Sequence, residues 1–247
     1  MKASASPASR ANRSPFFLSV IVFLLAVISG CASSVGGGVA ESFDASSLDN
    51  SEVMLVDSQI RVYELSLSGS EEVPEWSKEA KAAVDASMKE YLSNELDWQI
   101  SATPELSPEE LSVLEEHVAL YELLALQHLN RTTMNGWVKH RPDFDVTLGP
   151  GLSFLKDSSD YNFALLSIGE EYNTSGGRAA ANVLMAVAFG TTLPTGHAML
   201  HVGLVDIETG ALTWTNTAIS TSHNLKDETG SSTMVKQAFK NIDKAPE

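Results

Sequence analysis

The stretch that most constrains the fold is YNFALLSI, residues 161–168, because it is almost continuously apolar. Successive side chains of a strand point to opposite faces of a sheet, so an apolar strand without polar alternation must be covered on both faces. Residues 161–168 therefore predict a central strand with other elements packed on each side of it.

Amphipathic helices are predicted on either side of this strand in the chain. From Trp76 to Leu96, apolar residues recur every four positions, which is the spacing of one helix face. The sequence SPEE from residue 107 offers an N-cap, a proline at the first helical position and a glutamate that can close a capping box. Leucines over 120–129 widen the apolar stripe of this second helix, which we interpret as a core helix, with a partner-binding helix or a coiled coil as the alternatives. A last helix is predicted over 231–242.

Strands are predicted over 53–56 and 60–67, and a hairpin joins 197–207 to 211–219. Strands with helices interspersed and at least one hairpin predict an α/β (α+β) fold, in which helices pack on a mixed β-sheet.

The amino terminus has the pattern of an export signal. Residues 1–15 carry three basic and no acidic residues, and the run from Phe16 to Ile28 is apolar apart from Ser19. As a helix this run rises only about 20 Å, whereas the core of a bilayer is about 30 Å thick. We therefore expect a cleaved signal peptide and not a permanent span.

The chain has a single cysteine, directly after this run. Ile28-Ser29-Gly30-Cys31 resembles the lipobox of bacterial lipoproteins. The resemblance implies cleavage between Gly30 and Cys31, a diacylglycerol on the thiol and palmitate or a similar acyl chain on the freed amine, which together make a stable membrane anchor. Because Ala32 and not an aspartate follows, it implies the periplasmic face of the outer membrane of a Gram-negative bacterium. A buried free thiol or a simple secretory signal is the alternative.

Three segments follow from these patterns: a signal peptide over 1–30, a lipidated cysteine with a flexible Ser/Gly/Ala tether over 31–50, and a single α/β periplasmic domain over 51–247. Removing residues 1–30 leaves 13 basic and 32 acidic residues, a net charge of −19. This balance disfavours nucleic acid and anionic lipid surfaces, and suits solubility or a basic partner.

Histidines are the main candidates for chemistry. His197 and His201 lie four residues apart on a predicted strand, so both imidazoles face one side and could bind one metal ion with an acid such as Asp206. No glutamate follows His197 as a zinc-binding helix requires. Two histidines on a half-exposed sheet face is the simpler interpretation, and we expect neither metal nor cofactor.

Two further groups stand between the central strand and the hairpin. Glu170 and Glu171 are adjacent, so they should point to opposite faces, and we expect both to be solvated at a strand end. Gly176-Gly177-Arg178 begins a predicted helix whose free N–H groups could hold an anion. The chain has no phosphate-binding glycine motif and no nucleophile elbow, so we expect the glycines to serve a turn, and we assign no catalytic residue.

A pattern of turn and strand residues spans 160–216: Tyr172, Ser175, Gly177, Arg178, Leu204, Val205, Asp206, Thr209, Gly210 and Trp214. It resembles the carboxy-terminal region of a group of largely uncharacterised proteobacterial envelope lipoproteins. More distantly it is similar to the curli-secretion-channel lipoproteins and to the amino-terminal domain of the Tol-system propeller protein. The resemblance implies a periplasmic α/β domain and brings no catalytic residues.

These features favour a non-enzymatic, lipid-anchored protein that assembles or scaffolds an envelope complex through an envelope protein partner. A metal-dependent periplasmic enzyme using His197 and His201 is one alternative. The other is an oligomeric secretion pore, with residues 176–200 inserted in the membrane. Residues 179–189 are apolar on all sides and not at every second position, which disfavours the pore.

Overall fold

A computed structural model of the chain describes residues 33–34, 37–41, 43–48, 52–135, 146–158, 161–240 and 242. The strands are β1 (Ser33–Ser34), β2 (Gly38–Val39), β3 (Glu52–Leu55), β4 (Gln59–Leu65), β5 (Ser70–Glu72), β6 (Gln99–Ala102), β7 (Tyr161–Thr174), β8 (His197–Asp206) and β9 (Leu212–Ser220). The helices are η1 (Ala45–Leu48), α2 (Pro74–Asn94), α3 (Pro108–Asn135), η2 (Pro150–Leu152), α4 (Leu155–Ser158), α5 (Gly176–Phe189) and α6 (Glu228–Ala238).

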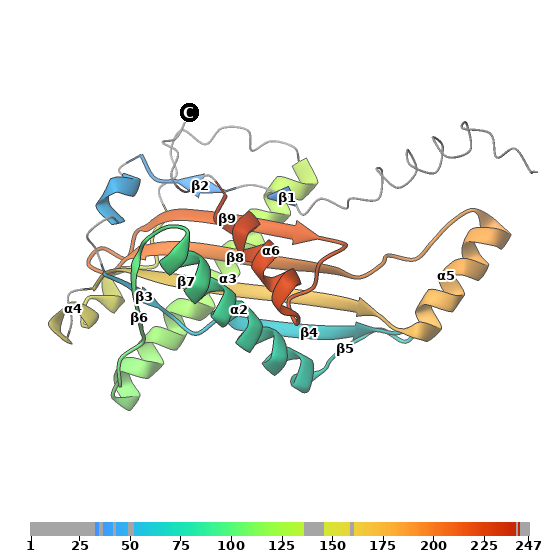
Figure 1. Cartoon of the computed structure of the whole chain (residues 1–247), viewed down its shortest axis with the longest axis horizontal. Helices are drawn as coiled ribbons and strands as arrows, with labels where there is room; N and C mark the ends of the chain where they lie inside the picture. Colours follow the sequence, from blue (N-terminus) through green and yellow to red (C-terminus); the bar gives the residue numbers. More distant parts are fainter. Residues whose placement is uncertain are drawn as a thin grey trace, which may run out of the picture. The chain divides into compact units, whose positions relative to one another are not determined.

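The strands form one mixed sheet in which β7 is the long central strand (Figure 1). The order is β1-β9-β8-β7-β3-β6, and in addition β2 pairs with β9, β4 with β7 and β5 with β4. The antiparallel strands β7, β8 and β9 form one half. On the other side of β7, β3 and β4 run parallel to it one after the other, since Leu55 lies opposite Leu165 and Gln59 opposite Ile168. The predicted mixed sheet with packed helices is confirmed.

The two faces of β7 are both buried, as its apolar sequence predicts. Phe163 and Leu165 belong to a core under α2 and α6, whereas Ala164 and Leu166 belong to a second core under α3. The sheet is therefore the middle layer between helices on opposite faces.

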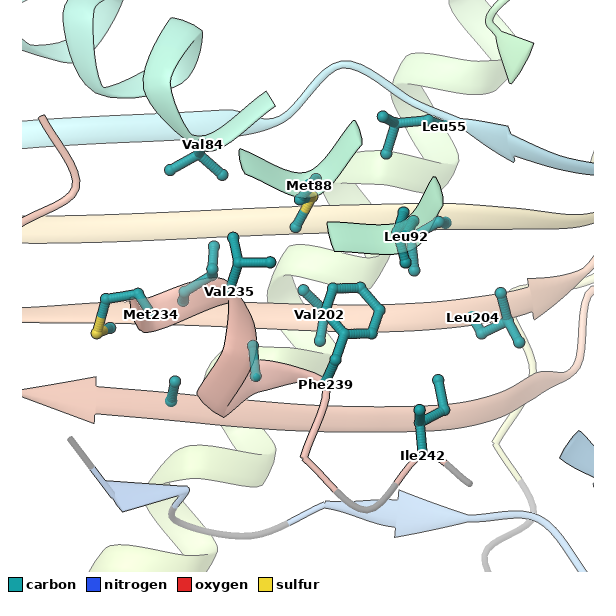
Figure 2. Close-up of a cluster of buried hydrophobic side chains, with 14 of the residues drawn as sticks. Leu55, Val84, Met88, Leu92, Val202, Leu204, Met234, Val235, Phe239 and Ile242 are labelled. Carbon is teal, nitrogen blue, oxygen red and sulfur yellow. The ribbon is translucent and has the colours of Figure 1, made fainter. Parts of the chain in front are cut away.

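Helix α2 buries the stripe that its four-residue spacing predicts. Ala80, Val84, Met88 and Leu92 are each 0% exposed. Figure 2 shows Val84, Met88 and Leu92 in the same buried cluster as Phe239, which directly follows α6. Complete burial of one large aliphatic side chain contributes about 1.5–3 kcal/mol. Together with α6, this stripe covers one sheet face.

Helix α3 begins with the predicted capping box. The backbone N–H of Ser107 donates to Oε2 of Glu110 at 2.8 Å, and the N–H of Glu110 donates to Oγ of Ser107 at 3.3 Å. Leu114 and Tyr121 then bury against the second sheet face.

The segment predicted to be a flexible tether joins the fold over its described residues. Strands β1 and β2 pair antiparallel with β9. Phe43 is 9% exposed and Leu48 is 1% exposed. For the described residues between 33 and 48, the expectation of a free tether was therefore wrong. Glycine at position 37 lets the segment approach β9 closely, and Phe43 and Leu48 bury in the core with Val39, Ala40 and Ala45 packed against it.

Candidate functional site

The tertiary structure places the two candidate histidines in different surroundings. His201 is 2% exposed, with Nδ1 2.8 Å from Oγ1 of Thr217. His197 stacks on Tyr172, with ring centroids 5.1 Å apart. Asp206 ends β8, at the opposite end of the strand from His197. In the described ranges no three His, Cys, Asp or Glu side chains are grouped closely enough to hold a metal ion.

A polar cavity of about 590 Å³ lies where β7 ends and β8 begins. Tyr172 forms part of its wall and stacks on its other side against Tyr63, with centroids 4.9 Å apart. Burial and the Glu170 carboxylate raise the pKa of Tyr172 to about 12, so its hydroxyl stays protonated at neutral pH and donates to Glu170 at 3.2 Å. The remaining lining is mostly hydroxyl, amide and imidazole groups: Glu171, Asn173, Thr174, Thr195, Gly196, His197, Thr221, Ser222, His223 and Asn224.

The two adjacent glutamates point to opposite faces, as predicted, but Glu171 is not solvated. It is 2% exposed and accepts hydrogen bonds from the backbone N–H of Leu225 at 2.6 Å and from Nδ2 of Asn173 at 2.7 Å. The expectation was wrong because β7 continues to Thr174, so position 171 lies inside the sheet. Glu171 ties the segment before α6 to the central strand, which is a structural role.

Arg178 is also used within the fold. Its guanidinium donates to the carbonyl of Ser66 at 2.9 Å and to that of Pro194 at 3.3 and 3.2 Å. The Ser175 side chain caps α5 by accepting from the N–H of Arg178. Nothing lies within 4 Å of a Cβ added at Gly177, so the helix start does not require glycine at that position. Arg178 holds the base of α5 in place.

The Asp-x-x-Thr-Gly turn joins β8 to β9. Oδ1 of Asp206 accepts from the N–H and the hydroxyl of Thr209, each at 2.8 Å. Gly210 has φ 70°, in the left-handed region that favours glycine. Trp214 is 3% exposed and stacks on Phe239, with centroids 5.7 Å apart. These residues build the hairpin and one core.

The predicted cleavage and lipidation residues, Gly30 and Cys31, lie outside the described residues, so the anchor stays a prediction. Among the helices that the structure describes, none combines the length and the apolar composition needed to cross a membrane.

Exposed apolar side chains were not among the predicted site residues. In the described part of the chain the large ones fall in two groups, which we call the α5 end and the α3 surface. The α5 end comprises Leu67, Val183, Leu184, Val187 and Phe189, and the α3 surface comprises Leu111, Leu120 and Leu123. The apolar run 179–189 and the extra leucines of the α3 sequence were the available signals.

A groove of about 410 Å³ accompanies the α3 surface. It lies between α3 and the β3–β4 connection and is lined by Leu111, Leu114, Val118, Ala119, Val56, Gln59, Thr103, Asp57, Glu115 and Glu122. The apolar floor of the groove continues from Ala119 to the exposed side chain of Leu123, because these residues are four positions apart on one helix face. Helix α3 and the short helices η2 and α4 cover this sheet face, whereas α2 and α6 cover the other.

The rim of the groove is acidic. Glu122 is held by a bidentate pair with Arg61, at 2.6 and 2.9 Å, and Asp57 lies 3.0 Å from Nζ of Lys81. The Nζ of Lys81 also forms an ion pair with Oδ2 of Asp85, at 2.8 Å. Glu115 adds a further carboxylate, so the rim retains negative charge.

Comparison with known proteins gives only a weak structural likeness. No family model matches the chain, and no curated protein matches it in sequence. A solved structure of a PelC dodecamer from Paraburkholderia phytofirmans matches with a TM-score of 0.40 and 8% identity, over 87% of this chain and 100% of that one. A point variant of PelC matches with a TM-score of 0.38 and 9% identity, over 85% and 95%. Values this low say nothing about what this chain binds or does.

Proposed function

We propose that this chain is a lipid-anchored protein on the periplasmic face of the outer membrane, and that its domain binds another envelope protein and does not catalyse a reaction. The observation that carries the proposal is the α3 groove, in which an apolar floor is exposed beside an acidic rim. Leu111, at the edge of this floor, is 45% exposed.

The chemistry of the groove defines its partner. Exposed leucines are stabilised by apolar side chains from the other protein, at about 25 cal/mol per Å² buried. Carboxylates at the rim favour basic groups and disfavour acidic ones, which contributes mainly to specificity and association rate. The partner is therefore a segment that carries apolar and basic side chains together.

The anchor supplies the second part of the proposal. An acyl chain on Cys31 holds the domain at one membrane, so the domain meets partners within that layer at high effective concentration. The polar cavity beside His197 is assigned no reaction, since Glu171 and Tyr172 are already bonded within the fold.

Site-specific crosslinking in cells tests the groove. A photoreactive amino acid at Leu111 should give a discrete adduct, whereas the same group at Glu90, on the exposed face of α2, should not. Glu115→Lys should abolish the Leu111 adduct, and Glu115→Gln should only weaken it. Mass spectrometry of the adduct should identify a partner peptide with apolar and basic residues. Equal adducts from positions 111 and 90, or an adduct unaffected by Glu115→Lys, would contradict the proposal.

A further inference from the structure

We infer that the α5 end is a second membrane contact, in which α5 lies in the lipid of the leaflet that holds the acyl chains of Cys31. The inference rests on the proposed anchor and adds a lipid-binding surface to it. The described residues support it in three ways: the exposure of α5, the pairing of its polar groups and the register of β1.

Helix α5 has no buried residue. Val183 is 64% exposed, Leu184 70%, Val187 84% and Phe189 74%. A helix that is apolar all round is normally enclosed by protein or by lipid. At 14 residues it is about 21 Å long, too short to cross a bilayer core of about 30 Å. Its dimensions fit insertion into one leaflet.

The segment that would enter the lipid has no charge. Residues 179–196 contain no Asp, Glu, Lys, Arg or His, so insertion desolvates no ionised side chain. Asn182 pairs with the return segment: its Oδ1 accepts from the N–H of Leu193 at 2.8 Å, and its Nδ2 donates to the carbonyl of Leu193 at 3.4 Å. Unpaired backbone groups are costly in lipid, and this pairing removes two of them.

The register of β1 places Ser33 at the same end of the sheet as α5. Ser33 lies opposite Ile219, which lies opposite Met199, which lies opposite Glu170 near the end of β7. Three strand spacings separate Ser33 from β7, about 14 Å. Cys31 precedes Ser33 by two residues, a reach of at most about 7 Å. Figure 1 shows α5 beyond this end of the strands.

Charge favours lipid over a second copy of the chain as the occupant. Two mature chains carry −19 each and repel one another. Protein interfaces also have a polar rim around an apolar centre, whereas 179–196 has no charged residue to form one. A leaflet of zwitterionic lipid needs no such rim.

Depth-dependent quenching tests the contact on the full, lipidated chain. Val187→Cys introduces the one free thiol, because the sulfur of Cys31 carries lipid, and it is labelled with a polarity-sensitive fluorophore. The matched control is Glu208→Cys, in the turn at the other end of β8. Vesicles contain phosphatidylethanolamine with a minor fraction of phosphatidylglycerol, with or without brominated acyl chains.

We expect the label at position 187 to shift to shorter wavelengths and to be quenched by brominated lipid, and the label at 208 to do neither. Adding Leu184→Glu should reduce the quenching severalfold, and Leu184→Met should not. An unquenched label at 187 would overturn the inference. Spin labels at 187 that couple between copies, without lipid quenching, would overturn it in favour of a second copy.

Failure of the anchor gives a different result. Mass spectrometry of the unlabelled protein reports the acyl chains on Cys31 independently of position 187. Absent acylation contradicts the proposed anchor, whereas acylated protein with an unquenched label contradicts only the α5 contact.

Discussion

The ring of Tyr121 in α3 lies directly against the backbone of Gly203 in the middle of β8. Tyr121 is 0% exposed, and its hydroxyl lies 3.3 Å from Oγ1 of Thr215. Burial raises the pKa of Tyr121 above its usual range. A Cβ at position 203 would overlap the ring, so α3 can approach this sheet face only over a glycine.

Gly203→Ala should therefore destabilise the fold. The added methyl group must displace a buried ring, and overpacking of this kind costs about 1–3 kcal/mol. Chemical denaturation measures the change in the free energy of unfolding. The control is Gly177→Ala, where nothing lies within 4 Å of the added group and the change should stay within about 0.5 kcal/mol. Equal effects of the two substitutions would show that Tyr121 does not pack as described.

Glu171→Leu should destabilise the fold through a lost acceptor. The N–H of Leu225, which donates to Glu171 at 2.6 Å, would be left buried and unpaired, at a cost of about 1–3 kcal/mol. Glu171→Gln keeps an acceptor and should cost less. Amide hydrogen exchange at Leu225 should speed up in the Leu variant more than in the Gln variant. Unchanged exchange in both would contradict the assigned role.

Asp227 should make the stability of α6 depend on pH. Its Oδ1 accepts from the N–H of Gly230 at 2.7 Å, and this bond, with a second from Asn224, holds the pKa of Asp227 below its usual range. A lowered folded pKa means that the stabilisation is complete above the unfolded pKa of about 3.9 and is lost as pH falls through the folded value.

Asp227→Ala should cost about 0.5–2 kcal/mol at neutral pH. The difference in unfolding free energy between wild type and this variant should shrink as the pH is lowered below about 4. Asp227→Ser keeps a cap that does not titrate, so its stability should be less sensitive in that range. A wild type–Ala difference that is constant from neutral to acidic pH would rule out the carboxylate as the cap.

Two phenylalanines lie in contrasting surroundings, one in the core and one on the surface. Phe239 is 1% exposed and Phe189 is 74% exposed. Phe239→Ala should cost about 3–5 kcal/mol because it leaves a cavity beside Trp214. Phe189→Ala should change the free energy of unfolding by no more than about 0.5 kcal/mol. A large loss of stability for Phe189→Ala would mean that α5 packs on the domain, and it would remove the basis for the membrane contact.

Local patterns predicted the elements that depend on local interactions. The capping box at Ser107, the four-residue stripe from Ala80 to Leu92 and the hairpin around Gly210 each involve residues close in sequence, so spacing and residue type were sufficient. Boundaries were less exact: β7 runs on to Thr174 and α6 begins at Glu228.

The surroundings of the candidate site residues depend on contacts between residues far apart in the chain, and the spacing of residues in the sequence does not reveal such contacts. Glu171 was expected in solvent, but the segment carrying Leu225 folds over it from 54 positions away. The Ser/Gly/Ala segment was expected to be free, but it pairs with β9. The extra leucines of α3 were assigned to a core, but Leu123 is 59% exposed.

The sequence by itself determined that an apolar central strand must lie between two helical layers, since side-chain alternation and helix periodicity are properties of neighbouring residues. It also specified the predicted anchor through the order of residues 28–31. Only the tertiary structure decided that α5 stays outside the core and that β1 lies at its end of the sheet, because which apolar surfaces are covered depends on how distant segments pack.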